Sequence, residues 1–76
     1  MLITIITTIK FYLKFHKKNE YNVISLLEEY CNDYDLTYKI LSKEKLWFGR
    51  RKFHISLHGE INKATFVSNY LPIQII

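Results

Sequence analysis

Three consecutive cations stand close to the chain's only tryptophan in the stretch LWFGRRKFHISLH, residues 46–58. Arg50, Arg51 and Lys52 are suited to contact phosphates or carboxylates, and the Trp47 ring is suited to stack on a nucleic-acid base. Gly49 favours a turn, which would bring the ring and the charges together at a hairpin. The stretch therefore predicts contact with an acidic partner. A solvated surface hairpin is the alternative.

Other reactive side chains lack the spacing that catalysis or metal binding requires. His54 and His58 share a strand face but lie about 13 Å apart, too far to chelate one metal. Cys31 falls on the apolar stripe of a predicted helix, where a core role is commoner than that of a nucleophile. Glu28 and Glu29 point about 100° apart on that helix and form no catalytic pair. We therefore expect no enzyme activity, no metal and no cofactor.

Length and composition indicate one small basic domain. The chain has 76 residues, a net charge of +4 and a single cysteine, so residues 1–76 are expected to form one domain with a thin stability margin, which dimerisation would relieve. One cysteine allows no internal disulfide and fits a reducing, cytoplasmic setting. The apolar start, Met1 to Ile9, is too short to span a bilayer and lacks the features of a signal peptide. We expect no membrane association.

Apolar periodicity predicts six elements. Alternation predicts a strand over 3–15, and helical spacing predicts a helix from Asn19 or Glu20 to about Tyr34. The remaining elements are strands over 37–48 and 51–58, a helix over 62–71 and a short strand over 73–76. Asn62 is the expected N-cap of the second helix, and Pro72 is expected to end it. The irregular pattern near Ser42 and Glu44 predicts a bulge or a partly covered end strand.

This order predicts an α+β, ferredoxin-like βαββαβ fold. Its four-stranded antiparallel sheet would have the order 4-1-3-2, with two helices on one face. Over nearly the whole chain the topology resembles the small ligand-sensing ACT domains, although the glycine that follows their first strand is absent from HKKNE, residues 16–20. The resemblance implies a regulatory or binding domain. The same fold also occurs among small phage and plasmid proteins that block host defence.

Strand alternation predicts that the sheet face away from the helices, here called the open face, is basic and bears aromatic rings. Five of the seven acids fall in or near the first helix, so we expect a basic sheet without carboxylates and an acidic helix layer. The predicted binding residues are Lys10, Tyr12, Lys14, Lys43, Lys45, Trp47, Arg50, Arg51, Lys52 and His54.

These residues favour a non-enzymatic module that binds single-stranded nucleic acid, with cations on phosphates and rings on bases. The alternative is a protein-binding regulator or inhibitor, of the phage or mobile-element anti-defence type, that acts as a monomer or small homo-oligomer. Trp47, Phe48, Arg50 and Arg51 would anchor it. A third interpretation is that the lysines keep the protein soluble and protect the sheet edge from pairing.

Overall fold

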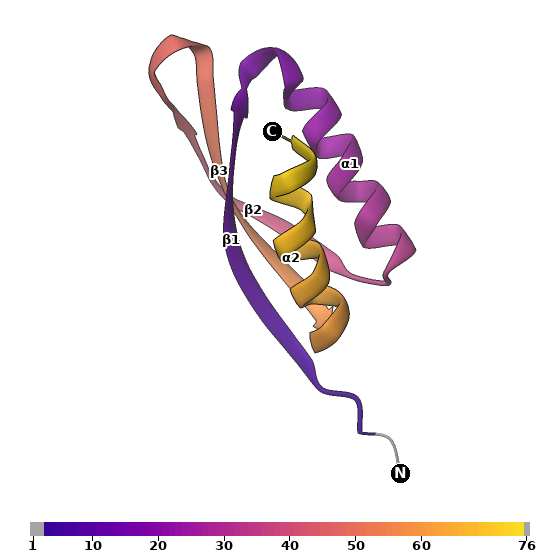
Figure 1. The fold of residues 1–76 in the computed structure, drawn as a ribbon. Helices are drawn as coiled ribbons and strands as arrows, with labels where there is room; N and C mark the ends of the chain where they lie inside the picture. Colours follow the sequence, from indigo (N-terminus) through magenta and orange to yellow (C-terminus); the bar gives the residue numbers. More distant parts are fainter. Residues whose placement is uncertain (1–2, 76) are drawn as a thin grey trace.

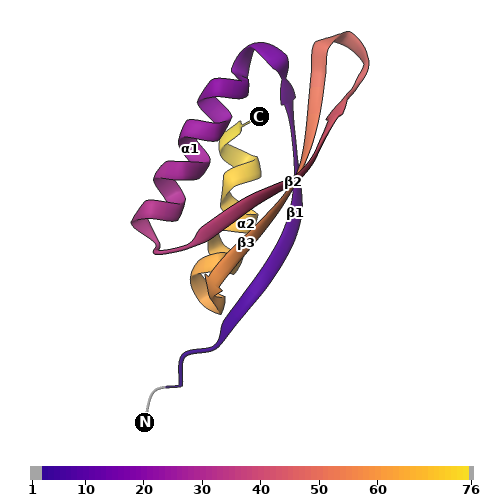
Figure 2. The same cartoon turned by 180° about the vertical axis from the view of Figure 1, so that it is seen from behind.

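The computed structural model describes residues 3–75 and shows a sheet covered on one face by two helices (Figure 1 and, from behind, Figure 2). The strands are β1 (Ile6–His16), β2 (Thr37–Lys45) and β3 (Arg50–Glu60), and the helices are α1 (Glu20–Asp33) and α2 (Ile61–Ile75). Short 3-10 turns at Lys17–Asn19 and Trp47–Gly49 connect β1 to α1 and β2 to β3. Among the described residues, no helix is long and apolar enough to cross a membrane.

The sheet has three antiparallel strands in the order β1-β3-β2, so the predicted ferredoxin-like βαββαβ fold with a four-stranded 4-1-3-2 sheet is wrong. The expected last strand fails because α2 continues through Pro72 to Ile75, while Ile76 lies outside the described residues. Ala64, Val67 and Leu71 are fully buried, and Ile75 packs against the same core. This apolar stripe runs past Pro72 at helical spacing, so burial outweighs the hydrogen bond that proline removes.

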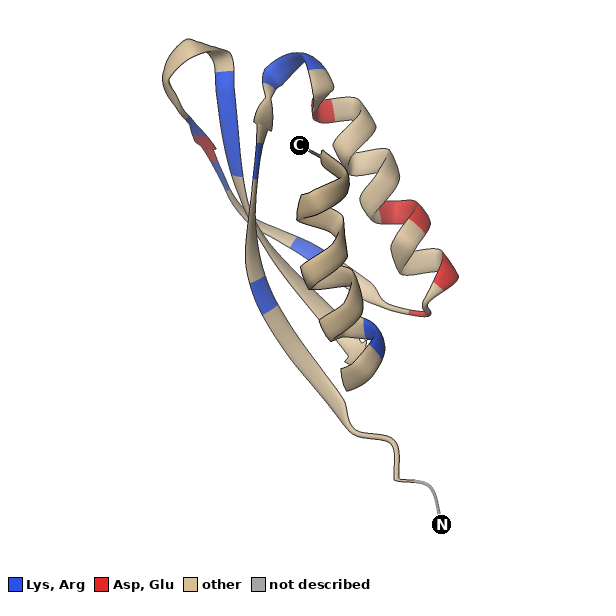
Figure 3. Ribbon diagram, viewed as in Figure 1, with Lys and Arg blue, Asp and Glu red and all other residues tan. Residues whose placement is uncertain are grey.

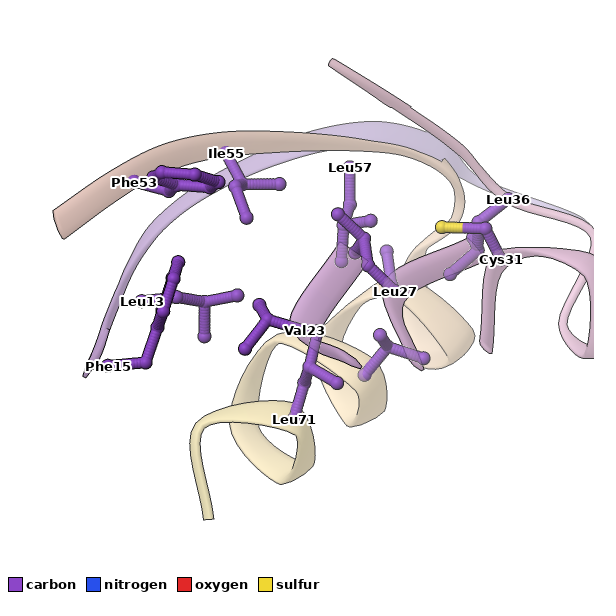
Figure 4. Packing of buried hydrophobic residues seen from close by; sticks show 12 residues of the cluster. Leu13, Phe15, Val23, Leu27, Cys31, Leu36, Phe53, Ile55, Leu57 and Leu71 are labelled. Atoms are coloured by element: carbon purple, nitrogen blue, oxygen red, sulfur yellow. The ribbon is translucent and has the colours of Figure 1, made fainter. Parts of the chain in front are cut away.

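The core lies between the sheet and the helices (Figure 4). Val23, Leu27 and Cys31 form the buried stripe of α1, which confirms the helix predicted there. They pack with the α2 stripe against the helix-facing side of the sheet. Its buried strand residues are Leu13, Phe15, Phe53, Ile55 and Leu57, all of which have odd numbers because strand side chains alternate between faces.

The start of α2 differs from the predicted one. The Glu60 carboxylate accepts hydrogen bonds from the backbone N–H groups of Asn62 and Lys63, each at 3.2 Å. Glu60 therefore caps the helix in place of Asn62, and β3 passes into α2 without a loop. Gly59 lies within β3, and its lack of a side chain leaves space for Leu36, whose Cδ2 atom a Cβ atom there would meet.

The two sheet interfaces differ in regularity. β1 pairs with β3 in one unbroken register from Ile6 opposite Glu60 to His16 opposite Arg50. β2 pairs with β3 less regularly, because the register shifts between Ile40 and Ser42. This confirms the predicted bulge on an end strand.

Candidate nucleic-acid interface

The unbroken β1–β3 register builds the centre of the open face. Directly opposite residues of paired strands point to the same face, so the even-numbered side chains of β1 lie beside those of β3. Their pairs along the face are Thr8 with His58, Lys10 with Ser56, Tyr12 with His54, and Lys14 with Lys52.

An aromatic pair occupies the middle of this face. The rings of Tyr12 and His54, here called the ring pair, are stacked with centroids 4.3 Å apart and an angle of 17° between their planes. The Lys52 Nζ atom lies 4.4 Å from the centroid of the Tyr12 ring, a cation–π contact. Tyr12 remains 53% exposed, and Lys10 and Lys14 stand on either side of it along β1. Ring surface and positive charge therefore meet at one accessible place.

The bulge in β2 corrects the predicted composition of the open face. Leu41 is the extra residue, so the positions after it change sides: Lys43 lies opposite Phe53, and Lys45 lies opposite Arg51. Both lysines therefore project from the helix-facing side, and the Lys43 Nζ atom lies 5.1 Å from the centroid of the buried Phe53 ring. The prediction that they share the open face is wrong.

The same change of sides brings a carboxylate to the open face. Glu44 lies opposite Lys52, and Ser42 lies opposite His54. The expectation of a face without acids is therefore also wrong. Lys39 precedes the bulge and lies opposite Ser56, so it is on the open face.

The turn between β2 and β3 exposes two large rings. Trp47 is 85% exposed and Phe48 is 93% exposed, and with Gly49 they form what we call the hairpin tip. The Leu46 N–H closes the turn by donating to the Arg50 carbonyl oxygen at 2.8 Å. Phe48 adopts a left-handed backbone conformation, with φ of 60°, which is costly for a bulky residue. The predicted turn at Gly49 is confirmed, with φ of 76°.

Positive charge gathers at the end of the molecule that carries the hairpin (Figure 3). A Cβ atom on Gly49 would lie 3.0 Å from the His16 ring, so the tip adjoins the end of β1 and the lysines that follow it. Eight of the eleven cationic side chains belong to this hairpin end: Lys14, Lys17, Lys18, Lys43, Lys45, Arg50, Arg51 and Lys52. Acids of α1 and its C-terminal edge lie toward the opposite end: Glu28, Glu29, Asp33 and Asp35. Charge is thus separated along the length of the molecule.

The structure separates the predicted binding residues into three groups. The open face unites Lys10, Tyr12, Lys14, Lys52 and His54. Arg50 adjoins them, because it lines a groove of about 330 Å³ together with Tyr12 and Lys14. Lys43, Lys45 and Arg51 project from the other face, and Trp47 stands at the tip.

The remaining reactive side chains have structural partners. His58 Nδ1 and Thr8 Oγ1 are hydrogen-bonded at 2.8 Å across β1 and β3. Cys31 is buried, and that burial raises the pKa of its thiol to about 11, which disfavours the reactive thiolate. Within residues 3–75, no group of three or more His, Cys, Asp or Glu side chains is placed to hold a metal ion.

A cluster of four rings between the helices was missed by the sequence analysis. Tyr30 and Tyr34 of the α1 end contact Tyr70 and Phe66 of α2, with centroid distances of 5.9 and 5.5 Å. Burial and the neighbouring tyrosines raise the pKa of Tyr30. The spacing of four residues within each aromatic pair is the signal that could have revealed it.

No protein-family model, curated protein or solved structure matches this chain.

Proposed function

We propose that this protein is a non-enzymatic module that binds single-stranded nucleic acid on its open face. The supporting observation is the ring pair of Tyr12 and His54, which stands between Lys10 and Lys14 with Lys52 over the Tyr12 ring. Bases stack on exposed rings without regard to sequence, and the lysines around them neutralise phosphates. A cytoplasmic location, which a buried unpaired cysteine fits, belongs to the same proposal.

In this proposal one ring contacts a base, and the cationic side chains contact the phosphates of the nucleic acid. Tyr12 offers its exposed ring to a base, and His54 supports that ring from the neighbouring strand. Lys52 exchanges its contact with the ring for a contact with a phosphate. Lys10, Lys14 and Arg50 extend the positive surface along the strand on which the chain of nucleotides would lie.

The test uses fluorescence anisotropy with labelled single-stranded RNA and DNA at two salt concentrations. Lys52→Glu is the test variant, and Lys43→Glu is its matched control, because it makes the same change of charge on the opposite face. We expect micromolar binding that weakens with salt, is lost in Lys52→Glu and survives in Lys43→Glu. Absence of binding at low salt, or an equal loss in both variants, contradicts the proposal.

A second candidate function is favoured by the hairpin tip. Trp47 and Phe48 are almost fully exposed beside Arg50 and Arg51, and tryptophan and arginine dominate the binding energy of protein interfaces when buried there. This protein would then be a regulator or inhibitor that inserts its tip into an acidic pocket of a partner. Its affinity would depend on Trp47 and respond only weakly to salt, because a buried apolar anchor is little screened. Nucleic-acid binding predicts a steep salt response.

A further inference from the structure

The outer edge of β1 has no neighbouring strand in the described part of the chain. β1 is 11 residues long and pairs only with β3, because residues 73–75, once expected to extend the sheet, belong to α2. An edge of this length presents a row of backbone groups that a further strand can use.

The observed hydrogen bonds show which backbone groups face outward. Ile61 N–H donates to the Ile5 carbonyl at 2.9 Å, where the β1–β3 register continues, and the Arg50 carbonyl faces β2. The N–H and C=O groups of successive residues point to opposite edges of a strand. The N–H and C=O groups of the odd-numbered β1 residues therefore point toward β3. The N–H and C=O groups that face the free edge therefore belong to Thr8, Lys10, Tyr12 and Lys14.

We propose that a second copy of this chain adds its β1 to this edge, antiparallel and centred on Phe11. In an antiparallel pair of β1 strands, residues whose backbone groups point outward must lie opposite each other to form hydrogen bonds. Only registers that place even-numbered residues opposite even-numbered residues meet this condition. Centring on Phe11 pairs the whole strand, from Ile6 opposite the partner's His16 to His16 opposite the partner's Ile6.

Charge selects this register over its neighbours. Centred on Phe11, Lys10 lies opposite the partner's Tyr12, and Lys14 lies opposite the partner's Thr8. Centring on Lys10 would set two lysines directly opposite each other, and centring on Tyr12 would set Lys10 against the partner's Lys14. Like charges in directly opposite positions destabilise a strand pair, whereas Phe11 against the partner's Phe11 is favourable. The β1 sequence is thus self-complementary, as a two-fold interface requires.

A groove lies against part of this edge. It has a volume of about 330 Å³ and is lined by Tyr12, Leu13, Lys14 and Arg50 together with Pro72 and Ile75 of α2. Pairing there would join two sheets into one of six strands and make the two open faces continuous. The dimer does not depend on nucleic-acid binding, so the two proposals fail separately.

The first test uses the unaltered chain without nucleic acid. Light scattering over a range of concentrations gives the mass, and hydrogen exchange followed by NMR gives the protection of single amides. We expect twice the chain mass of 9.2 kDa at high concentration, with protected amides at Thr8, Lys10, Tyr12 and Lys14. The amides of Ile9 and Leu13, which face β3, serve as the internal control. A 9.2 kDa particle, or a dimer whose outward amides exchange quickly, overturns the proposal.

The second test reads the register through disulfides in a Cys31→Ala background. Phe11→Cys would face itself in a pair without direct hydrogen bonds, where Cα atoms approach to about 4.5 Å and a disulfide fits. Lys10→Cys is the control, because its partner copy would lie about 7–8 Å away on the diagonal. We expect cross-linked dimer from Phe11→Cys alone. Cross-linking of Lys10→Cys alone overturns this register, and if Phe11→Cys does not fold, the exchange test remains decisive.

Discussion

Tyr12 and His54 occupy directly opposite positions on β1 and β3, and their rings stack with centroids 4.3 Å apart. The contact depends on a register without irregularity over the whole length of β1. It therefore belongs to the most regular part of the sheet, where backbone pairing holds the two residues directly opposite each other.

The ring pair leads to the first prediction. Tyr12→Leu should weaken single-stranded RNA or DNA binding by about 1–3 kcal/mol, since a base loses its stacking surface. The free energy of unfolding should change by less, about 0.2–1 kcal/mol for a cross-strand pair. Anisotropy and urea unfolding measure the two effects. His58→Ala, on the same face but outside the ring pair, is the control, and equal loss of binding in both variants would count against a stacking role.

Phe48→Gly should raise the free energy of unfolding by about 1 kcal/mol. The gain arises because glycine adopts the left-handed conformation without the penalty that Phe48 bears at φ of 60°. Urea unfolding measures it, with Trp47→Ala as the control, expected within about 0.5 kcal/mol of the original chain because Trp47 is highly exposed. A loss of stability in Phe48→Gly would show that the ring has a structural role.

Gly59→Ala should lower the free energy of unfolding by about 1–3 kcal/mol. The added Cβ atom meets Leu36 Cδ2, and Leu36 is itself buried against the core, so the side chain must shift. Combining Gly59→Ala with Leu36→Ala should cost less than the sum of the single changes, because the second removes the atom with which the first collides. Strictly additive losses in urea unfolding would rule out this contact.

Glu60→Ala should lower the free energy of unfolding by about 1 kcal/mol, because it removes both hydrogen bonds that cap α2. Asn62→Ala should change the free energy of unfolding little, since the substitution keeps the backbone N–H of residue 62, which donates to Glu60. Thermal or urea unfolding of the two variants distinguishes the observed cap from the predicted one. A larger effect at Asn62 would place the helix start where the sequence suggested.

Stability should fall at alkaline pH, partly through Cys31. The thiol has an ordinary pKa of about 8.5 in the unfolded chain, and burial raises its pKa to about 11 in the fold. Between these values the unfolded chain has released a proton that the folded chain retains, so rising pH favours unfolding. The contribution is complete below about pH 8.5 and is lost as the pH rises through the folded pKa.

Urea unfolding at about pH 8 and about pH 10.5 checks this prediction, with Cys31→Ala as the comparison. Burial also raises the pKa values of Tyr30 and Tyr38, so the variant should keep part of the alkaline loss. An identical loss in both proteins would exclude a contribution from the thiol.

Local periodicity was enough to predict most elements of the fold. β1, α1 and β3 each bury one regular stripe, and their patterns of two or of three to four residues are visible without tertiary information. The end of the chain was mispredicted because the expectation that a proline ends a helix considers only its neighbours in the sequence. Whether a helix continues past Pro72 depends on what Leu71 and Ile75 can pack against, which only the assembled core determines.

The candidate site was predictable only where the strands pair regularly. Lys10, Tyr12, Lys14, Lys52 and His54 lie on the predicted face because one unbroken register connects them. Lys43 and Lys45 do not, because a single extra residue reverses the sides of all later positions in β2. The sequence indicated a bulge but not its position relative to these lysines, and that position decides their face.

The uneven distribution of charge along the molecule affects how it meets a partner. Most cations lie at the hairpin end and most acids of α1 lie toward the other end, so the protein has an electric dipole moment. The field of an approaching polyanion would rotate the protein before contact. The exposed rings of Trp47 and Phe48 would then arrive first, ahead of the sheet. Such orientation acts on the association rate constant and weakens as ionic strength rises, whereas the dissociation rate constant depends on the contacts made after arrival.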